Sequence, residues 1–307
     1  MGSGRWDASD WGTYATAHVL SAKSVDDIYT ARKIDDSLNP LGVDIRESRD
    51  SADNPNSTPV IVALDVTGSM GKVLDAMART GLATLATEVY DRKPISDPHI
   101  MFMGIGDVSA GDRSPLQITQ FEADIRIAEQ LNKLHLERGG GGNDSESYTL
   151  AWLFAGLHTS TDNFEKRGKK GYLFTLGDEE PNMVLTKKEI ERVLGYAPEN
   201  DYTAEQLLAI VSRQYEVFHL IVADTGHYRN NERKILSAWQ NLLGERAIIL
   251  DDHTKMAEVI TSTLEVMNGK LAKDVVASWD GSTGLTVAKA INGLVANAKD
   301  NGGLVTF

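Results

Sequence analysis

The chain has 307 residues, enough for one large domain or two modest ones. Its 31 Lys and Arg residues against 44 Asp and Glu residues give a formal net charge of -13, which argues against nucleic acid or an anionic membrane surface as a partner. The absence of cysteine excludes disulfides, thiol catalysis and cysteine-bound metals. No apolar run reaches the length of a membrane span and no signal peptide is recognisable, so we expect a cytoplasmic protein.

Residues 1–57 are predicted to form a helical N-terminal extension and linker that packs on the main body. Ser9 is expected to cap a first helix, and Ser24 a second one that continues to Ile34. The segment Ser48–Pro59 (SRDSADNPNSTP) is a loop by composition. Two short helices bury too little apolar surface to be stable alone, which is why we expect them to pack on the body.

Residues 58–269 are predicted to form the main domain, because short apolar runs alternate there with longer amphipathic ones. The runs are nearly continuous rather than alternating, which is typical of strands buried on both faces. One of them, Leu116–Phe121, alternates and follows a short Gly/Asp/Pro loop, so we expect an antiparallel edge strand. The predicted strands are Pro59–Asp65, His99–Gly106, Leu116–Phe121, Gly171–Leu176, Glu216–Ala223 and Ala247–Leu250.

Helices are predicted between these strands. Thr186 and Thr203 each begin a capping-box pattern, and Gly195 stands where the first of these helices should end. Residues 270–307 are predicted to be a C-terminal helical tail packed on the domain. The remaining predicted helices are Met70–Tyr90, Ser147–Leu157, Glu232–Leu243, Lys255–Met267 and Thr286–Ala298. The alternation predicts an α/β fold with a doubly wound, mostly parallel, Rossmann-like sheet of about six strands flanked by helices.

Acidic side chains follow several of the predicted strands. In open α/β sheets, ligands bind outside the carboxyl ends of the strands. The first strand runs into Asp65-Val-Thr67-Gly-Ser69, and the fourth into Gly177-Asp178-Glu179-Glu180. A loop of four glycines, Gly139–Gly142, continues as Asn-Asp-Ser-Glu before the next helix. Asp107 is interpreted as a turn residue, and Glu179 and Glu180 as solvated loop charges.

This oxygen-only set of side chains suits a hard divalent cation, Mg²⁺ or Mn²⁺ (or Ca²⁺), rather than zinc. Without a cation, the converging carboxylates would repel one another and raise one another's pKa values. The candidate metal ligands are Asp65, Thr67, Ser69, Asp144, Ser145, Glu146 and Asp178. No catalytic residue is assigned in this interpretation.

The motif Asp65-x-Thr67-x-Ser69 resembles the Asp-x-Ser/Thr-x-Ser signature of von Willebrand factor A (vWA) domains. The glycine loop resembles their second metal loop, and Asp178 the aspartate of their third. The resemblance implies a metal-ion-dependent adhesion site (MIDAS), in which hydroxyls bind the ion directly, the aspartates act largely through water, and a partner's carboxylate completes the octahedron. The whole chain resembles stand-alone bacterial or phage vWA proteins, which implies a protein partner such as a MoxR-type ATPase or an assembly complex.

Two departures from that pattern bear on the metal. The second loop lacks the usual Gly-Gly-Thr, so Asp144, Ser145 and Glu146 are all candidates for its ligand. An acidic ligand there would hold the ion without a partner carboxylate. In the third loop the carboxylate of Asp178 is displaced by two positions from the usual Thr-Asp-Gly.

Three alternatives stay open at this point. The residues of the first loop could simply cap the following helix. The chain could be a structural or virion-assembly protein in which the metal is only stabilising. It could also be a serine hydrolase, since Ser69 lies in a near nucleophile-elbow pattern and Asp224 and His253 follow in the Ser–Asp–His order of α/β-hydrolases.

Overall fold

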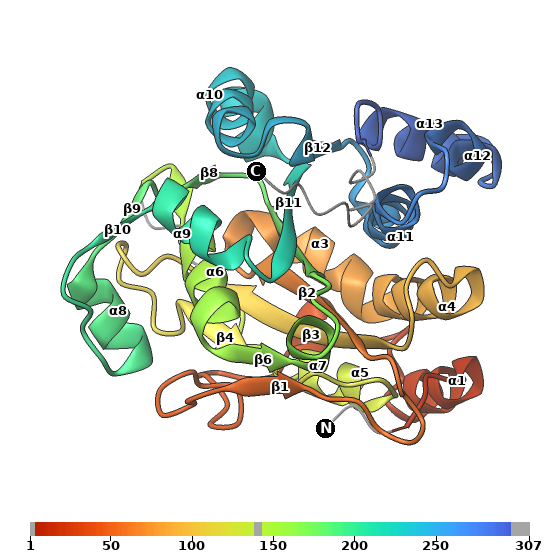
Figure 1. Cartoon of the computed structure of the whole chain (residues 1–307), viewed down its shortest axis with the longest axis horizontal. Helices are drawn as coiled ribbons and strands as arrows, with labels where there is room; N and C mark the ends of the chain where they lie inside the picture. Colours follow the sequence, from red (N-terminus) through yellow and green to blue (C-terminus); the bar gives the residue numbers. More distant parts are fainter. Residues whose placement is uncertain (1–3, 138–142, 296–307) are drawn as a thin grey trace, which may run out of the picture.

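The protein folds around one six-stranded sheet, seen here in a computed structural model that describes residues 4–137 and 143–295. The strands lie in the order β12-β11-β7-β2-β3-β4, and all neighbours are parallel except the edge pair β3–β4 (Figure 1). Their bounds are β2 Thr58–Asp65, β3 Pro98–Ile105, β4 Leu116–Ile118, β7 Gly171–Gly177, β11 Tyr215–Val222 and β12 Ala247–Leu250. The predicted doubly wound α/β sheet with an antiparallel edge strand is confirmed.

Successive residues of the central strands point to opposite faces of the sheet, and each face has its own core. On one face Val60, Val62 and Leu64 pack with α3 (Gly71–Ala76), α4 (Leu82–Arg92) and α11 (Met256–Met267). On the other face Ile61 and Ala63 pack with α6, α8, α9 and α10. Those four helices span Tyr148–Leu157, Lys187–Leu194, Ala204–Val211 and Gly226–Leu243. The strands are therefore buried on both sides, as their continuous apolar runs predict.

The N-terminal residues belong to the first of these cores. Trp6 and Tyr14 are buried in it, and the indole of Trp6 donates to Thr87 Oγ1 at 3.3 Å. The first helix, α1 (Ala8–Ala17), is capped by Asp7 rather than by Ser9, because the Asp7 carboxylate accepts from the Ser9 backbone N–H. The second, α2 (Val25–Ile28), has the predicted cap at Ser24 but is one turn long, so the prediction of a helix to Ile34 was wrong.

Several helix boundaries differ from the prediction for local reasons. The predicted helix Met70–Tyr90 starts with a 3₁₀ turn, η1 (Gly68–Met70), and is interrupted between α3 and α4 by a π-helical turn, η2 (Met77–Gly81). The helix α10 begins at Gly226, six residues early, because Thr225 caps it. In the C-terminal tail, α13 (Gly281–Ala290) follows α12 (Ala272–Ala277) and begins five residues before the predicted start at Thr286. Residues 296–298 of the predicted helix lie outside the described part of the chain.

Three short strand pairs lie outside the main sheet and were not predicted. Parallel pairs join β1 (Arg46–Ser48) to β6 (Thr159–Thr161) and β5 (Ser145–Glu146) to β8 (Glu180–Pro181). An antiparallel pair joins β9 (Val184–Leu185) to β10 (Tyr202–Thr203). The remaining short helices are α5 (Arg126–Leu131), α7 (Asp162–Glu165), η3 (Gly244–Arg246) and η4 (His253–Lys255).

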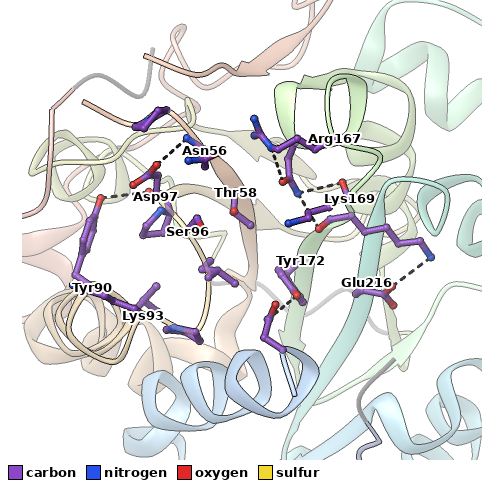
Figure 2. A pocket seen from close by; sticks show the side chains of 18 of the residues that line it. Asn56, Thr58, Tyr90, Lys93, Ser96, Asp97, Arg167, Lys169, Tyr172 and Glu216 are labelled. Carbon is purple, nitrogen blue, oxygen red and sulfur yellow. Dashed lines mark hydrogen bonds and ion pairs between the residues drawn. The ribbon is translucent and has the colours of Figure 1, made fainter. Parts of the chain in front are cut away.

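The two edges of the sheet border different surroundings. The carboxyl edge, where the parallel strands end, carries the loops with the predicted metal ligands. The amino edge borders a polar cavity beside Thr58 and Tyr172 (Figure 2). None of the helices in residues 4–137 and 143–295 is long and apolar enough to cross a membrane.

Candidate metal centre at the carboxyl edge of the sheet

The topology brings the first and third acidic loops together. The strands β2 and β7 are parallel neighbours, with Leu64 opposite Leu176, so Asp65 and Asp178 leave adjacent strands at the same edge. Strand order along the chain reverses between these two strands, because β2 leads to β3 on one side while β7 lies on the other. This reversal is the point at which doubly wound sheets open a crevice for ligands.

The side chain of Asp65 is fully buried and held by three hydrogen bonds. Its Oδ1 accepts from the backbone N–H of Thr67 at 2.8 Å and from the Thr67 hydroxyl at 2.6 Å. Its Oδ2 accepts from the Tyr148 hydroxyl at 3.2 Å. Tyr148 lies in the first turn of α6, and sequence reasoning missed it, because its place beside Asp65 depends on how α6 packs on the sheet.

Ser69 links the first loop to the third. Its hydroxyl donates to Asp178 Oδ1 at 2.8 Å, although 109 positions separate the two residues. Asp178 is fully buried, and its other oxygen, Oδ2, has no hydrogen-bond partner among the described residues. Asp65, Thr67, Ser69 and Asp178 are thus brought together as predicted from their loops.

The second loop contributes one of its three candidates to this cluster. Glu146 is 1% exposed and faces inward from β5, whereas Asp144 is exposed and forms an ion pair with Lys234 at 3.1 Å. Ser145 is half-buried and makes no side-chain hydrogen bond within the described part of the chain. The pairing of β5 with β8 ties this loop to the third one. The preceding glycines, Gly139–Gly142, lie outside the described residues.

Glu179 corrects the interpretation of the third loop. It is 8% exposed rather than solvated, and its backbone carbonyl accepts from the indole of Trp239 at 2.9 Å. Glu180, its neighbour, does reach Lys234 at 2.9 Å. No local signal distinguishes these two glutamates, because the packing of α10 on the loop decides which one is buried. Asp107 is a turn residue as interpreted, since it accepts from the backbone and hydroxyl of Ser109.

The buried carboxylates raise one another's pKa values. Burial, and then the charge of Asp178, raises the pKa of Asp65 in spite of the hydrogen bonds it accepts. Burial, Asp65 and Glu179 together raise the pKa of Glu146. Burial and the charges of Asp65 and Asp178 raise the pKa of Glu179 to about 8. These shifts show that the cluster is strained electrostatically when all of its members are ionised.

The cluster has the chemistry of a hard-cation site. One oxygen each of Glu146, Asp178 and Glu179 is buried without a hydrogen-bond partner among the described residues. No three carboxylates of this cluster bring oxygens within 4.8 Å of one another, so a cation here would also need the hydroxyls of Thr67 and Ser69, and water. Oxygen-only donors of this kind fit Mg²⁺, Mn²⁺ or Ca²⁺.

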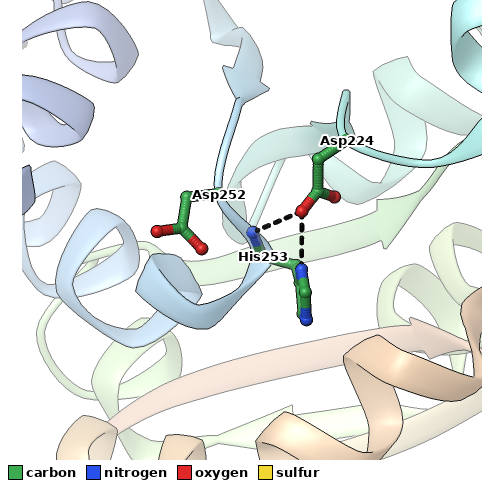
Figure 3. Close-up of side chains that lie close together, drawn as sticks. All are labelled: Asp224, Asp252 and His253. Carbon is green, nitrogen blue, oxygen red and sulfur yellow. Dashed lines mark hydrogen bonds and ion pairs between the residues drawn. The ribbon is translucent and has the colours of Figure 1, made fainter.

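A second group of ionisable side chains lies in the loops that follow β11 and β12. His253 Nδ1 is 2.6 Å from Asp224 Oδ2, and one potential ligand atom of each of Asp224, Asp252 and His253 falls within 4.8 Å of the others (Figure 3). Asp224 is also paired with Lys72 at 3.2 Å, and this ammonium would oppose a second cation. The Asp–His pair of the hydrolase alternative therefore forms, but no hydrogen bond among the described residues joins it to Ser69, whose hydroxyl donates to Asp178.

Comparison with known proteins reveals distant structural likenesses. No protein-family model and no curated protein sequence matches the chain. Solved structures that are similar include the pilus adhesin SpaC from Lactobacillus rhamnosus GG in its open conformation, at 15% identity and a TM-score of 0.46 over 75% of this chain. A second structure of that adhesin matches at 13% identity and a TM-score of 0.47, also over 75% of this chain. A von Willebrand factor type A protein from Catenulispora acidiphila matches at 14% identity and a TM-score of 0.38 over 71% of this chain.

This chain spans 31% and 32% of the adhesin chains and 44% of the Catenulispora chain. At these identities and TM-scores the matches do not assign the chain to a family. The fold class accordingly depends on the strand order and the helix layers described above.

Proposed function

We propose that this protein is a vWA-like module that binds a divalent cation, Mg²⁺ or Mn²⁺, at the carboxyl edge of its sheet and uses the ion to recognise a partner protein. The observation that carries the proposal is the meeting of Asp65, Ser69, Glu146 and Asp178 from three loops at the point where strand order reverses, with partnerless buried oxygens among them. A bound divalent cation would neutralise the repulsion between these carboxylates and offer a coordination position to a partner's carboxylate.

The residues of this chain would take three roles in that proposal. The Thr67 and Ser69 hydroxyls would contact the ion directly, while Asp65 and Asp178 orient those hydroxyls and hold bound water. The buried carboxylates of Glu146 and Glu179 would supply further negative charge. Ser69 is exposed, so an ion held beside it would be reachable from solution.

Calorimetric titration of Mn²⁺ tests the site. The wild type is expected to bind one ion, and Ser69→Ala to lose most of the affinity, because an exposed hydroxyl ligand is removed without disturbing the core. Ser96→Ala is the matched control, since Ser96 is an exposed serine at the opposite edge of the sheet. Absence of binding in the wild type, or equal loss in both variants, would contradict the metal site. Asp65→Ala is expected to abolish binding but needs a folding check, because Asp65 is fully buried.

The two buried glutamates favour a second candidate, in which the metal only stabilises a structural or assembly protein. A strongly anionic surrounding can hold an ion with no help from a partner. Water-proton relaxation by bound Mn²⁺ separates the two, because a recognition site needs an exchangeable water that acetate can displace. A bound ion without exchangeable water would favour the stabilising role.

Labelling distinguishes the hydrolase alternative. A serine-directed phosphonate is expected to leave Ser69 unmodified, because its hydroxyl is committed to Asp178 rather than to a histidine. Stoichiometric labelling of Ser69 that is lost in His253→Ala would instead establish catalysis.

A further inference from the structure

A cavity of about 960 Å³ opens at the amino edge of the sheet, opposite the acidic cluster. It is bordered by the starts of four strands, through Thr58, Pro98, Tyr172 and Glu216, and by the loop that follows α4 (Figure 2). Its volume is in the range of small-molecule sites. It shares no lining residue with the candidate metal centre.

The cavity concentrates positive charge in an acidic protein. Six cationic residues line it against two carboxylates, whereas the whole chain has a formal net charge of -13. The cationic residues are Arg5, Lys93, Arg167, Lys169, Lys170 and Arg246. Such a local excess of one sign focuses the electrostatic potential inside a recess and attracts counter-charged ligands.

Half of these cations are already paired with a carboxylate. Arg167 forms a two-pronged ion pair with Asp50, and Lys170 and Arg246 share Glu216. Arg5, Lys93 and Lys169 form no ion pair with a carboxylate in the part of the chain that the structure describes, and all three are exposed. These three therefore remain available to an anion in the cavity.

The loop that presents Lys93 is held in a set conformation. Lys93 and Asp97 have φ of 50° and 34°, a region that side-chain-bearing residues rarely adopt. Asp97 anchors the loop to the body, because its carboxylate accepts from the Asn56 backbone and its carbonyl from the Thr58 backbone. Backbone strain of this kind persists where the surroundings impose it, and it is often associated with ligand sites.

A helix end explains only part of the charge. Lys93 follows the last residue of α4, where a cation complements the negative end of the helix dipole. Lys169 and Arg5 lie outside any helix, so this effect does not account for them. Hydrogen-bonding groups that suit phosphate oxygens, from Asn56, Thr58 and Ser96, line the same cavity.

We propose that this cavity binds a small polyanion carrying phosphate groups. A ligand with several negative charges can engage the separated ammonium groups of Lys93 and Lys169 at once, each acting as a point charge. The recess favours a compact anion over an acidic face of a folded protein. The proposal does not depend on the metal site.

Calorimetric titration of sodium tripolyphosphate tests this proposal on the whole chain, in EDTA so that no divalent ion bridges protein and ligand. We expect binding that weakens steeply with salt, and about tenfold weaker binding in Lys93→Gln and in Lys169→Gln. Lys188→Gln is the matched control, because Lys188 is an exposed lysine on α8, outside the cavity. No binding by the wild type, or the same loss in the control, would overturn the proposal.

Two further measurements test whether polyanion binding is independent of the metal centre and specific for phosphate. Ser69→Ala is expected to bind tripolyphosphate like the wild type, so the result stands or falls independently of the metal centre. Citrate, a tricarboxylate, is expected to bind at least about tenfold more weakly than tripolyphosphate. Equal affinity for citrate would overturn the assignment to phosphate. Circular dichroism confirms that each variant is folded, which we expect because the substituted lysines are exposed.

Discussion

The two edges of the central sheet carry opposite charge in opposite surroundings. At the carboxyl edge Asp65, Glu146 and Asp178 are buried at 0%, 1% and 0% exposure. At the amino edge Lys93 and Lys169 are exposed and line an open recess. Net charge alone hides this division, because the value of -13 is summed over all charged residues of the chain.

The connectivity of the fold accounts for part of the difference. Helices that follow parallel strands begin at the carboxyl edge and return toward the amino edge, so their positive dipole ends face the acidic cluster and their negative ends face the basic cavity. The helix dipoles do not explain, however, why the carboxylates are buried. The carboxylates are buried because α6 and α10 pack on the loops that carry them. Their charges are therefore held in fixed positions, as a metal site requires.

Among the substitutions, the largest effect is expected where the acidic edge is packed most tightly. A Cβ at Gly177 would collide with the hydroxyl and ring of Tyr148, which donates to Asp65. Gly177→Ala should lower the free energy of unfolding by about 3 kcal/mol and abolish Mn²⁺ binding. Gly71→Ala is the control at the same edge, since its Cβ meets nothing within 4 Å and its φ of -53° is helical. Denaturant unfolding of both variants measures the difference; equal stabilities would contradict tight packing of this edge.

A pH series tests whether the buried carboxylates are unbalanced without metal. A carboxyl group whose pKa is raised by folding stabilises the fold below its unfolded pKa, and that stabilisation is lost as pH rises through the folded value, about 8 for Glu179. In EDTA the free energy of unfolding should therefore fall by about 3 to 4 kcal/mol between pH 5 and pH 8 from Glu179 alone. Saturating Mg²⁺ should remove most of this fall, because the ion neutralises the charge. A free energy of unfolding in EDTA that does not change between pH 5 and pH 8 would contradict the claim that the buried carboxylates are unbalanced without metal.

At the amino edge, Asp50 offers a test of opposite sign. Burial opposes its ionisation, yet hydrogen bonds from Arg167 and Ser57 hold its pKa well below the usual range. Its stabilisation is therefore present above the unfolded pKa and is lost as pH falls below that value. Asp50→Asn should cost about 1 kcal/mol at neutral pH and, by releasing Arg167, tighten tripolyphosphate binding. Thermal unfolding and calorimetry measure the two effects, and weaker polyanion binding would contradict the charge argument.

The smallest effect is expected at Lys234, a cation beside the acidic cluster. It is exposed and pairs with Asp144 and Glu180. Lys234→Gln should leave the melting temperature unchanged, because surface ion pairs contribute little. It should raise Mn²⁺ affinity about twofold, since one screened positive charge is removed from the neighbourhood of the ion. Lower Mn²⁺ affinity in this variant would place the ion elsewhere.

Local sequence patterns determined the sheet, most helices and the loops that form the candidate site. Continuous apolar runs specify buried strands wherever they occur, and capping boxes at Thr186 and Thr203 form as predicted because they involve only neighbouring residues. Asp65 and Asp178 could be placed at one edge from strand ends alone. Their role as metal ligands stays a prediction, as do the domain bounds and the partner.

Tertiary structure alone decided which of several equivalent side chains are buried. Glu179 and Glu180 are chemically identical neighbours, yet the Trp239 side of α10 and the β5–β8 pairing bury the first and leave the second with Lys234. In the second loop, likewise, Glu146 is buried while Asp144 is exposed and pairs with Lys234. The basic cavity joins residues from Arg5 to Arg246, which no local pattern connects. Burial and the gathering of charge depend on contacts between distant segments, and a side chain's own neighbours in the chain do not encode them.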